Sequence, residues 1–496
     1  MTMKEWKDLA LEHEEHERRA DEGGGAARQA RQARLGRLTA RERIARFVEH
    51  GSFVELARHV LHRHEASSGQ LAANRHPGDG VIAGVGRVGG RNVAVYAHDP
   101  TVLRGALGIE ASKKVCRLLD LAKEEKLPVV CFADSDGVRV DEGMDAIDAY
   151  GEIIRRTVTL QNEVLQLTLV CGLGVGAAAY TAALGDLVAM VKEQSYLFIT
   201  GPKVTKVVTG EDVTIEDLGG PEMHAKKTGQ CHAIVENEEA GIAWLKSVLA
   251  FTERAKIDAN ELDRATPEIA TIIPTAPRRA YDVKKVIAAI ADEGSTFELS
   301  PKFAPNLVTA FVRLAGAPVA IVASQPMVYA GCLDIDASRK GAHFVRLADK
   351  LGIPVVTLVD VPGYLPGKKQ EEGGILPHGS LLLSAYGAAT VPHVCLVLRK
   401  SYGGASVLSF AAKIRLALPT ARIGPMGADA AIEVIFGPEH DAMSEEEKKT
   451  RAERKAEWLR VNDTAWSPAA SGYIDQVVRP EDARRAIGRA LASLRG

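Results

Sequence analysis

Two clusters of glycine and other small residues mark places where the backbone itself could do chemistry. They are residues 172–178, with the sequence GLGVGAA, and residues 402–405, with the sequence YGGA. Glycine between a strand and a helix leaves N–H groups free to bind an anion or a developing oxyanion. Close packing of a helix on a strand also needs small residues, and for one cluster alone we would favour packing. Two clusters at matching places favour the oxyanion function.

The side-chain motifs of many enzymes are missing from the sequence. There is no GxxxxGK[ST] phosphate loop, no GxSxG turn and no HExxH motif. Gly172, Gly174 and Ala177 fit the dinucleotide pattern GxGxxG/A, but they lie too deep in the chain to open a βαβ unit, so we discount it. His224 and His232 have no partners at metal-ligand spacing. We therefore expect no metal site, and a reaction that relies on backbone donors.

Composition restricts the class of protein. The chain has 496 residues, of which 46% are hydrophobic and 25% charged, and a net charge of −2. This balance indicates two or three globular domains, and it argues against a nucleic-acid binder or a disordered chain. The six cysteines are scattered without a CxxC pair, as in a reduced cytosolic protein. The uncharged stretches 164–185 and 314–333 hold too much glycine or proline for membrane spans. We therefore expect a cytoplasmic protein.

The chain contains an internal repeat. When the sequence is shifted by 226 positions, about fifty residues align without a gap. The matched pairs include Arg87 with Arg313, Gly105 with Gly331, Leu107 with Leu333, Asp134 with Asp360, and Gly137 with Gly363. A single unbroken offset of this length predicts a duplication. We place the two domains at residues 1–255 and 256–496.

Each half has the same predicted order of elements. In the first half, strands are expected at 93–96, 128–132 and 167–171, with a helix at 109–124. Their counterparts are strands at 319–322, 354–359 and 394–398, with a helix at 335–351. Strands that alternate with helices predict an α/β fold.

The N-terminal region is predicted to be helical and rich in arginine. A basic helix carries Arg28, Arg31, Arg34 and Arg37 at intervals of three, and a capping box at residues 39–42 opens the next helix. These arginines form either a solvated face or a contact for ligand phosphates, and the sequence leaves both alternatives open.

Several longer motifs resemble the carboxyltransferase (β) subunits of biotin-dependent acyl-CoA carboxylases, the family of propionyl-CoA and acetyl-CoA carboxylases. The resemblance covers nearly the whole chain. It is carried by GRLTARERI at 36–44, GSFVE at 51–55, FITGP at 198–202, VTGEDV at 208–213, AGCLDID at 330–336, LVDVPGYLPG at 358–367, QEEGG at 370–374, RKSYGGA at 399–405 and PTA at 419–421.

This resemblance implies two tandem crotonase-like domains in a hexamer, a trimer of dimers. The N-terminal domain would hold the acyl-CoA, and the C-terminal domain of a partner subunit would receive carboxybiotin. The biotin would be carried by a biotin carboxylase/carboxyl carrier subunit, because this chain has no Ala-Met-Lys-Met attachment motif. The biotin itself would act as the base, which accounts for the missing catalytic side chain.

The resemblance also implies which residues form the site. Gly176 and Ala177 would donate N–H groups to the thioester enolate, and Gly404 and Ala405 would do the same for biotin. The remaining candidates are Arg41, Arg43, Ser135, Gly137, Tyr402 and Gly403 for cofactor binding, and Tyr180, Ser406 and Val407 for the substrate pocket.

The sequence departs from the family pattern at three places near this site. The usual Gly-Gly of the N-domain turn is Gly176-Ala177, and alanine keeps the N–H group. The usual Ser-Gly-Gly-Ala-Arg is SDGVR at residues 135–139, which brings a carboxylate close to the thioester. The usual Tyr-Asp after Gly-Gly-Ala is Ser406-Val407. Valine at the position of the acyl-pocket aspartate suggests a bulkier or more apolar acyl group than propionyl.

These departures leave three hypotheses. The first is a carboxyltransferase that acts on an acyl-CoA. The second is a decarboxylase of a malonyl-type thioester, carried by CoA or by an acyl-carrier protein, on the same scaffold. The third is a non-catalytic subunit that supports the assembly of a carboxylase.

Overall fold

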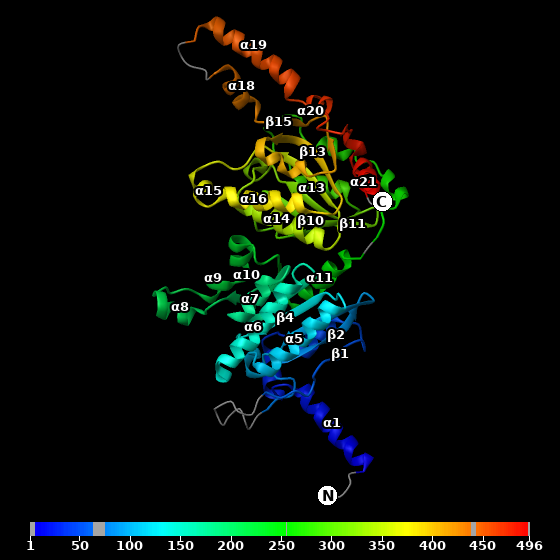
Figure 1. The fold of residues 1–496 in the computed structure, drawn as a ribbon, viewed down its shortest axis with the longest axis vertical. Helices are drawn as coiled ribbons and strands as arrows, with labels where there is room; N and C mark the ends of the chain where they lie inside the picture. The colour runs from blue at the N-terminus through cyan, green and yellow to red at the C-terminus, as the bar shows by residue number, and fades with distance from the viewer. Residues whose placement is uncertain (1–4, 63–74, 254, 438–442, 495–496) are drawn as a thin grey trace. The chain divides into compact units, whose positions relative to one another are not determined.

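The computed structural model describes residues 5–62, 75–253, 255–437 and 443–494 (Figure 1). These residues form two compact units, 1–250 and 251–496. Within the described ranges, no helix is both long enough and apolar enough to cross a membrane.

The N-terminal unit is built on an eight-stranded sheet. Its strand order is β1-β2-β3-β4-β5-β6-β8, and β7 pairs with β5 beyond this path. Strands β1 to β3 are antiparallel, and the pairs from β3 onward are parallel. The strands are β1 (Val54–Glu55), β2 (Val81–Val88), β3 (Arg91–His98), β4 (Val129–Ser135), β5 (Gln166–Val175), β6 (Leu187–Val191), β7 (Tyr196–Phe198) and β8 (Ala233–Val235).

Helices connect the parallel strands of this unit. The crossovers from β3 to β4 and from β4 to β5 are α5 and α6, which pack against each other (Figure 1). The described helices are α1 (Trp6–Glu22), α2 (Ala26–Arg34), α3 (Ala40–Phe47), α5 (Ile109–Glu124), α6 (Gly143–Leu160), α7 (Ala177–Leu184), α8 (Pro202–Thr209), α9 (Ile215–Gly219), α10 (Pro221–Met223) and α11 (Glu238–Phe251).

The C-terminal unit repeats the same sheet. Its strand order, β9-β10-β11-β12-β13-β14-β16 with β15 on β13, matches that of the first unit strand for strand. The strands are β9 (Phe297–Leu299), β10 (Leu307–Leu314), β11 (Ala317–Ser324), β12 (Val355–Val361), β13 (His393–Tyr402), β14 (Ile414–Ala417), β15 (Arg422–Gly424) and β16 (Gln476–Val477). The repeat seen in the sequence is therefore a duplication of the fold.

In the C-terminal unit α14 and α16 pack side by side on the sheet, as α5 and α6 do in the first (Figure 1). The described helices are α12 (Glu268–Ile272), α13 (Val283–Ile290), α14 (Ile335–Lys350), α15 (Lys368–Glu372), α16 (Ile375–Ala388), α17 (Val407–Phe410), α18 (Ala428–Phe436), α19 (Glu445–Asn462), α20 (Trp466–Ala470) and α21 (Ala483–Leu494).

The predicted elements correspond closely to those of the structure. The helix predicted at 109–124 is α5 with the same bounds, and the helix predicted at 335–351 is α14. The capping box is formed at Thr39 and Glu42, each side chain accepting from the other residue's amide. One detail is wrong: the basic helix α2 ends at Arg34, so Arg37 lies beyond it.

Candidate functional site

The candidate site of the N-terminal unit lies where loops meet at the carboxyl ends of parallel strands. Strand β3 leads to the short helix η1 (Leu103–Gly105), β4 leads to the loop 135–139, and β5 leads to α7. This edge of a parallel sheet is the usual place for a ligand in α/β proteins. A Cβ on Gly105 would lie 2.2 Å from the Asp134 carbonyl oxygen, so η1 touches the end of β4.

Most of the first glycine cluster belongs to strand β5, which continues through Val175. A Cβ on Gly172 would lie 2.0 Å from Asp134 Oδ1, and one on Gly174 would lie 2.5 Å from Leu197 Cδ2. These two glycines serve close packing. Only Gly176 forms the turn into α7, with a φ of 57° that a residue with a side chain rarely adopts.

The amides at this turn have different partners. The Gly176 amide donates to the Phe198 carbonyl at 3.1 Å, so it is already occupied. Ala177 is the first residue of α7, and the first amides of a helix have no acceptor within the helix. The amide available to a ligand at this turn is therefore that of Ala177, and Gly176 supplies the turn.

A second amide faces the same place; it lies in the SDGVR segment, but the sequence did not identify it as a donor. Leu107 donates to the Gly137 carbonyl and accepts from the Arg139 amide, both at 2.9 Å. In such a parallel bridge the amide of the residue between them, Val138, points away from Leu107. The turn at Gly176 and Ala177 lies on the side away from Leu107, because a Cβ on Gly137 would be 3.9 Å from the Ala177 nitrogen.

The C-terminal unit repeats this geometry, and its hydrogen bonds fix which residues correspond. The Leu173 amide donates to Asp134 Oδ1 at 3.2 Å, and the Lys400 amide donates to Asp360 Oδ1 at 3.1 Å. Leu173 therefore corresponds to Lys400, three residues before the turn glycine in each unit. Gly403, with a φ of 58°, is therefore the counterpart of Gly176 in the repeat.

Gly404 consequently corresponds to Ala177, and Ala405 to Ala178. Gly404 is exposed, whereas Ala405 is buried. Of the two residues proposed here from the sequence, Gly404 is the accessible one.

Tyr364 occupies the place that Val138 has in the first unit. Leu333 donates to the Gly363 carbonyl and accepts from the Leu365 amide, so the Tyr364 amide points away from Leu333. The Tyr364 ring lies 3.8 Å from the position of a Cβ on Gly404. Its buried hydroxyl has no hydrogen-bond partner among the described residues, and burial raises its pKa. The ring edge of Tyr364 faces Gly404, whereas its hydroxyl lies on the side of Gly379 in α16, 3.3 Å from the position of a Cβ there.

Two of the predicted cofactor-binding residues hold the turns in place. Ser135 is buried, and its Oγ accepts from the Gly137 amide at 3.0 Å. The Tyr402 hydroxyl donates to Asp463 Oδ1 at 2.8 Å, and Asp463 is also paired with Arg422. These two side chains are engaged within the protein and support the loops that carry the amides.

The predicted pocket residues lie beside these turns. Tyr180 is on the exposed side of α7, and its ring is about half accessible. Ser406 is half-buried and its Oγ accepts from Ser401 Oγ at 3.3 Å. Val407 begins α17, but its side chain lies outside the part of the chain that the structure describes.

The burial of Arg43 argues against the prediction that it binds cofactor, whereas the same prediction for Arg41, which is part-exposed, stays a prediction. Arg43 is fully buried and pairs with Glu238 at 2.6 Å and with Asp134 at 3.1 Å. Arg41 pairs with Glu55 and donates to the Ala20 carbonyl. Arg43 is a structural residue because its guanidinium neutralises two buried carboxylates, which would be costly to leave unpaired.

We expect Arg43→Gln to destabilise the N-terminal unit by about 3–5 kcal/mol, because it leaves Asp134 and Glu238 buried without a counter-charge. Chemical denaturation followed by circular dichroism would measure the change. Arg155→Gln, which removes an exposed pair with Glu152, is the control and should change stability by less than about 1 kcal/mol. If the Arg43→Gln variant had normal stability but bound CoA more weakly, Arg43 would belong to the ligand site.

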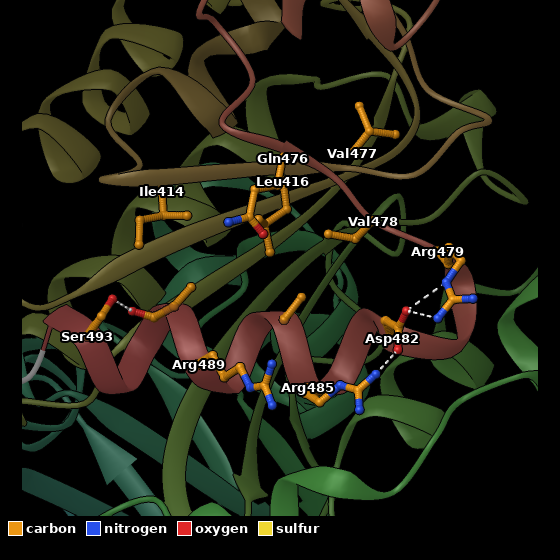
Figure 2. Close-up of a pocket in the computed structure, with 12 residues that line it drawn as sticks. Ile414, Leu416, Gln476, Val477, Val478, Arg479, Asp482, Arg485, Arg489 and Ser493 are labelled. Carbon is orange, nitrogen blue, oxygen red and sulfur yellow. Dashed lines mark hydrogen bonds and ion pairs between the residues drawn. The ribbon is translucent and has the colours of Figure 1, made fainter.

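A cavity of about 500 Å³ lies elsewhere in the C-terminal unit, between β14, β16 and α21 (Figure 2). Ile414, Leu416 and Val478 form its apolar part, and Arg485 and Arg489 of α21 also line it. None of the residues proposed above lines it. Within the described ranges, no group of three or more His, Cys, Asp or Glu residues could hold a metal ion.

Comparison with known proteins gives consistent results. Residues 31–495 match the family model of the carboxyl transferase domain. The propionyl-CoA carboxylase beta chain of Roseobacter denitrificans is 39% identical over 99% of this chain and 97% of its own. The human mitochondrial propionyl-CoA carboxylase beta chain is also 39% identical, over 94% of this chain and 87% of its own.

A crystal structure of transcarboxylase 12S, with methylmalonyl-coenzyme A and methylmalonic acid bound, matches with a TM-score of 0.93 at 38% identity. The match covers 99% of this chain and 97% of that one. The fold is therefore a pair of crotonase-like domains, and the similarity favours a carboxyltransferase over the decarboxylase and the assembly subunit. The chain belongs to the carboxyl transferase family and is a carboxyltransferase of the type found in biotin-dependent acyl-CoA carboxylases.

Proposed function

We propose that this protein transfers a carboxyl group from carboxybiotin to the α carbon of an acyl-CoA, using two pairs of backbone amides. The observation that carries the proposal is the repetition of one geometry: a strand, a glycine with φ near +57°, and an amide facing a neighbouring loop. The pairs are Val138 with Ala177 and Tyr364 with Gly404. This revises the pairs expected from the sequence, because the Gly176 amide is bonded and Ala405 is buried.

In the N-terminal unit, Val138 and Ala177 hold the thioester oxygen. Removal of the α-proton places negative charge on this oxygen, and two fixed donors stabilise that charge in the transition state more than in the ground state. Gly137 allows the two amides to approach, because a Cβ there would lie 2.6 Å from the Val175 carbonyl oxygen. Ser135 holds the same loop through its bond to the Gly137 amide.

In the C-terminal unit, the amides of Tyr364 and Gly404 hold the ureido oxygen of biotin. Bound biotin supplies the carboxyl group and the base for the α-proton. The ring of Tyr364 forms the wall beside Gly404, and its buried hydroxyl packs toward Gly379 of α16. No side-chain acid or base is required from the chain.

The protein acts as a homo-oligomer, a hexamer like that of transcarboxylase 12S, together with a subunit that carries biotin. Exposed apolar side chains beside the N-terminal site support this proposal, because a partner surface would cover them. They are Val140, Met144, Tyr180 and Ile199. The six free cysteines support a cytoplasmic location.

The test is loss of CO₂ from carboxylated thioesters. The purified protein is incubated with malonyl-, methylmalonyl- and longer alkylmalonyl-CoA, with and without free biotin, and the products are followed by mass spectrometry. We expect CO₂ loss that requires biotin, the reverse half-reaction of a carboxyltransferase. Loss at the same rate without biotin would make the protein a decarboxylase and overturn the proposal.

A further inference from the structure

An ion pair lies next to the amides of the N-terminal site. Arg104 in η1 and Asp136 in the loop after β4 are joined by a contact of 2.6 Å between Nε and Oδ2. The Asp136 amide also donates to the Arg104 carbonyl at 3.2 Å. Asp136 is followed directly by Gly137, which approaches the Ala177 amide. The pair therefore belongs to the loops that frame the thioester oxygen.

The duplicated fold shows that the turn does not need this pair. The same turn in the C-terminal unit carries Ala330, whose φ of 52° is close to the 57° of Arg104. The counterpart of Asp136 is Pro362, by the offset of 226. The same backbone is thus formed without either charge.

Stability does not account for the pair either. The Arg104 side chain is 83% exposed and that of Asp136 is 23% exposed, and an ion pair held by so exposed an arginine contributes little to folding. A left-handed backbone at a residue other than glycine is itself unfavourable. The exposed guanidinium can, however, exchange Asp136 for another carboxylate without a large rearrangement.

The reaction provides such a carboxylate. The carboxylated thioester carries one more negative charge than the uncarboxylated one, while the CoA phosphates are common to both. An unpaired Asp136 would repel this extra charge, and Arg104 attracts it. We propose that Arg104 and Asp136 form a specificity-determining pair that sets the relative affinity of the N-terminal site for carboxylated and uncarboxylated acyl-CoA, an inference that rests on the function proposed above.

The test compares the Kd values of methylmalonyl-CoA and propionyl-CoA, measured by calorimetry on the purified full-length protein. Arg104→Gly is the main variant, because glycine adopts the left-handed turn without strain. We expect it to weaken methylmalonyl-CoA binding about tenfold and propionyl-CoA binding less than about threefold, since only the first carries the extra carboxylate. Asp136→Asn should strengthen methylmalonyl-CoA binding by a few-fold.

The double variant Arg104→Gly/Asp136→Asn removes both charges, and its ratio of Kd values should return to within about threefold of the wild type. Arg155→Gln removes an exposed arginine of α6 and is the matched control, with no expected effect. An unchanged ratio in both single variants would overturn the inference while leaving biotin-dependent transfer intact. Wild-type protein that binds neither thioester and shows no biotin-dependent CO₂ loss would overturn the proposed function as well.

Discussion

Replacing Ala177 by proline is expected to lower the rate of carboxyl transfer about 10²–10³-fold, the usual effect of losing one oxyanion donor. Proline has no amide hydrogen, so the substitution removes the donor that faces the thioester oxygen. Ala177 is the first residue of α7, the helical position at which proline is best tolerated. The fold should therefore survive. Steady-state kinetics of biotin-dependent CO₂ loss from methylmalonyl-CoA would measure the effect, with most of the loss in kcat.

Ala177→Gly is the matched control, because it changes the same side chain and keeps the amide. It should retain activity within about fivefold, the cost being limited to the helix propensity of one residue. A proline variant with normal kcat and normal thermal stability would show that the Ala177 amide does not stabilise the enolate. The donor would then have to be sought elsewhere on the loop.

Replacing Gly404 by proline should abolish biotin-dependent turnover by the same mechanism in the C-terminal unit. The substitution deletes the amide of the exposed residue Gly404, beside Tyr364, and alters the start of the short helix η6 (Gly403–Ser406). We expect a loss of at least about 10²-fold in biotin-dependent CO₂ loss. Binding of methylmalonyl-CoA, measured by calorimetry, should remain near the wild-type value, because the thioester is held by the other unit.

The structure offers a close control for this experiment as well. Among the described residues, a Cβ on Gly404 would meet only Tyr364, at 3.8 Å, which is an ordinary contact. The corresponding residue of the other unit is already alanine. Gly404→Ala should therefore keep most of the activity. Full turnover in the proline variant would remove Gly404 from the proposed biotin site.

The sequence by itself determined the architecture and the chemical class of this protein. The offset of 226 residues predicted the duplication, and the shared order of elements in the two halves predicted α5 and α14 almost to the residue. These sequence patterns are local or repeat at a fixed distance along the chain. They can therefore be recognised without knowing which segments are in contact in the fold. The long motifs and the absence of a side-chain nucleophile pointed to a carboxyltransferase with backbone donors.

Tertiary structure alone decided which amides and charges are available. The Gly176 amide is occupied by Phe198, Arg43 is paired with Glu238 in the core, and Arg104 is paired with Asp136. Each partner lies between 22 and 195 positions away, and no pattern in the sequence brings it near. Hydrogen bonds and ion pairs depend on distances of about 3 Å, and only the folding of the strands onto one sheet sets such distances between remote residues.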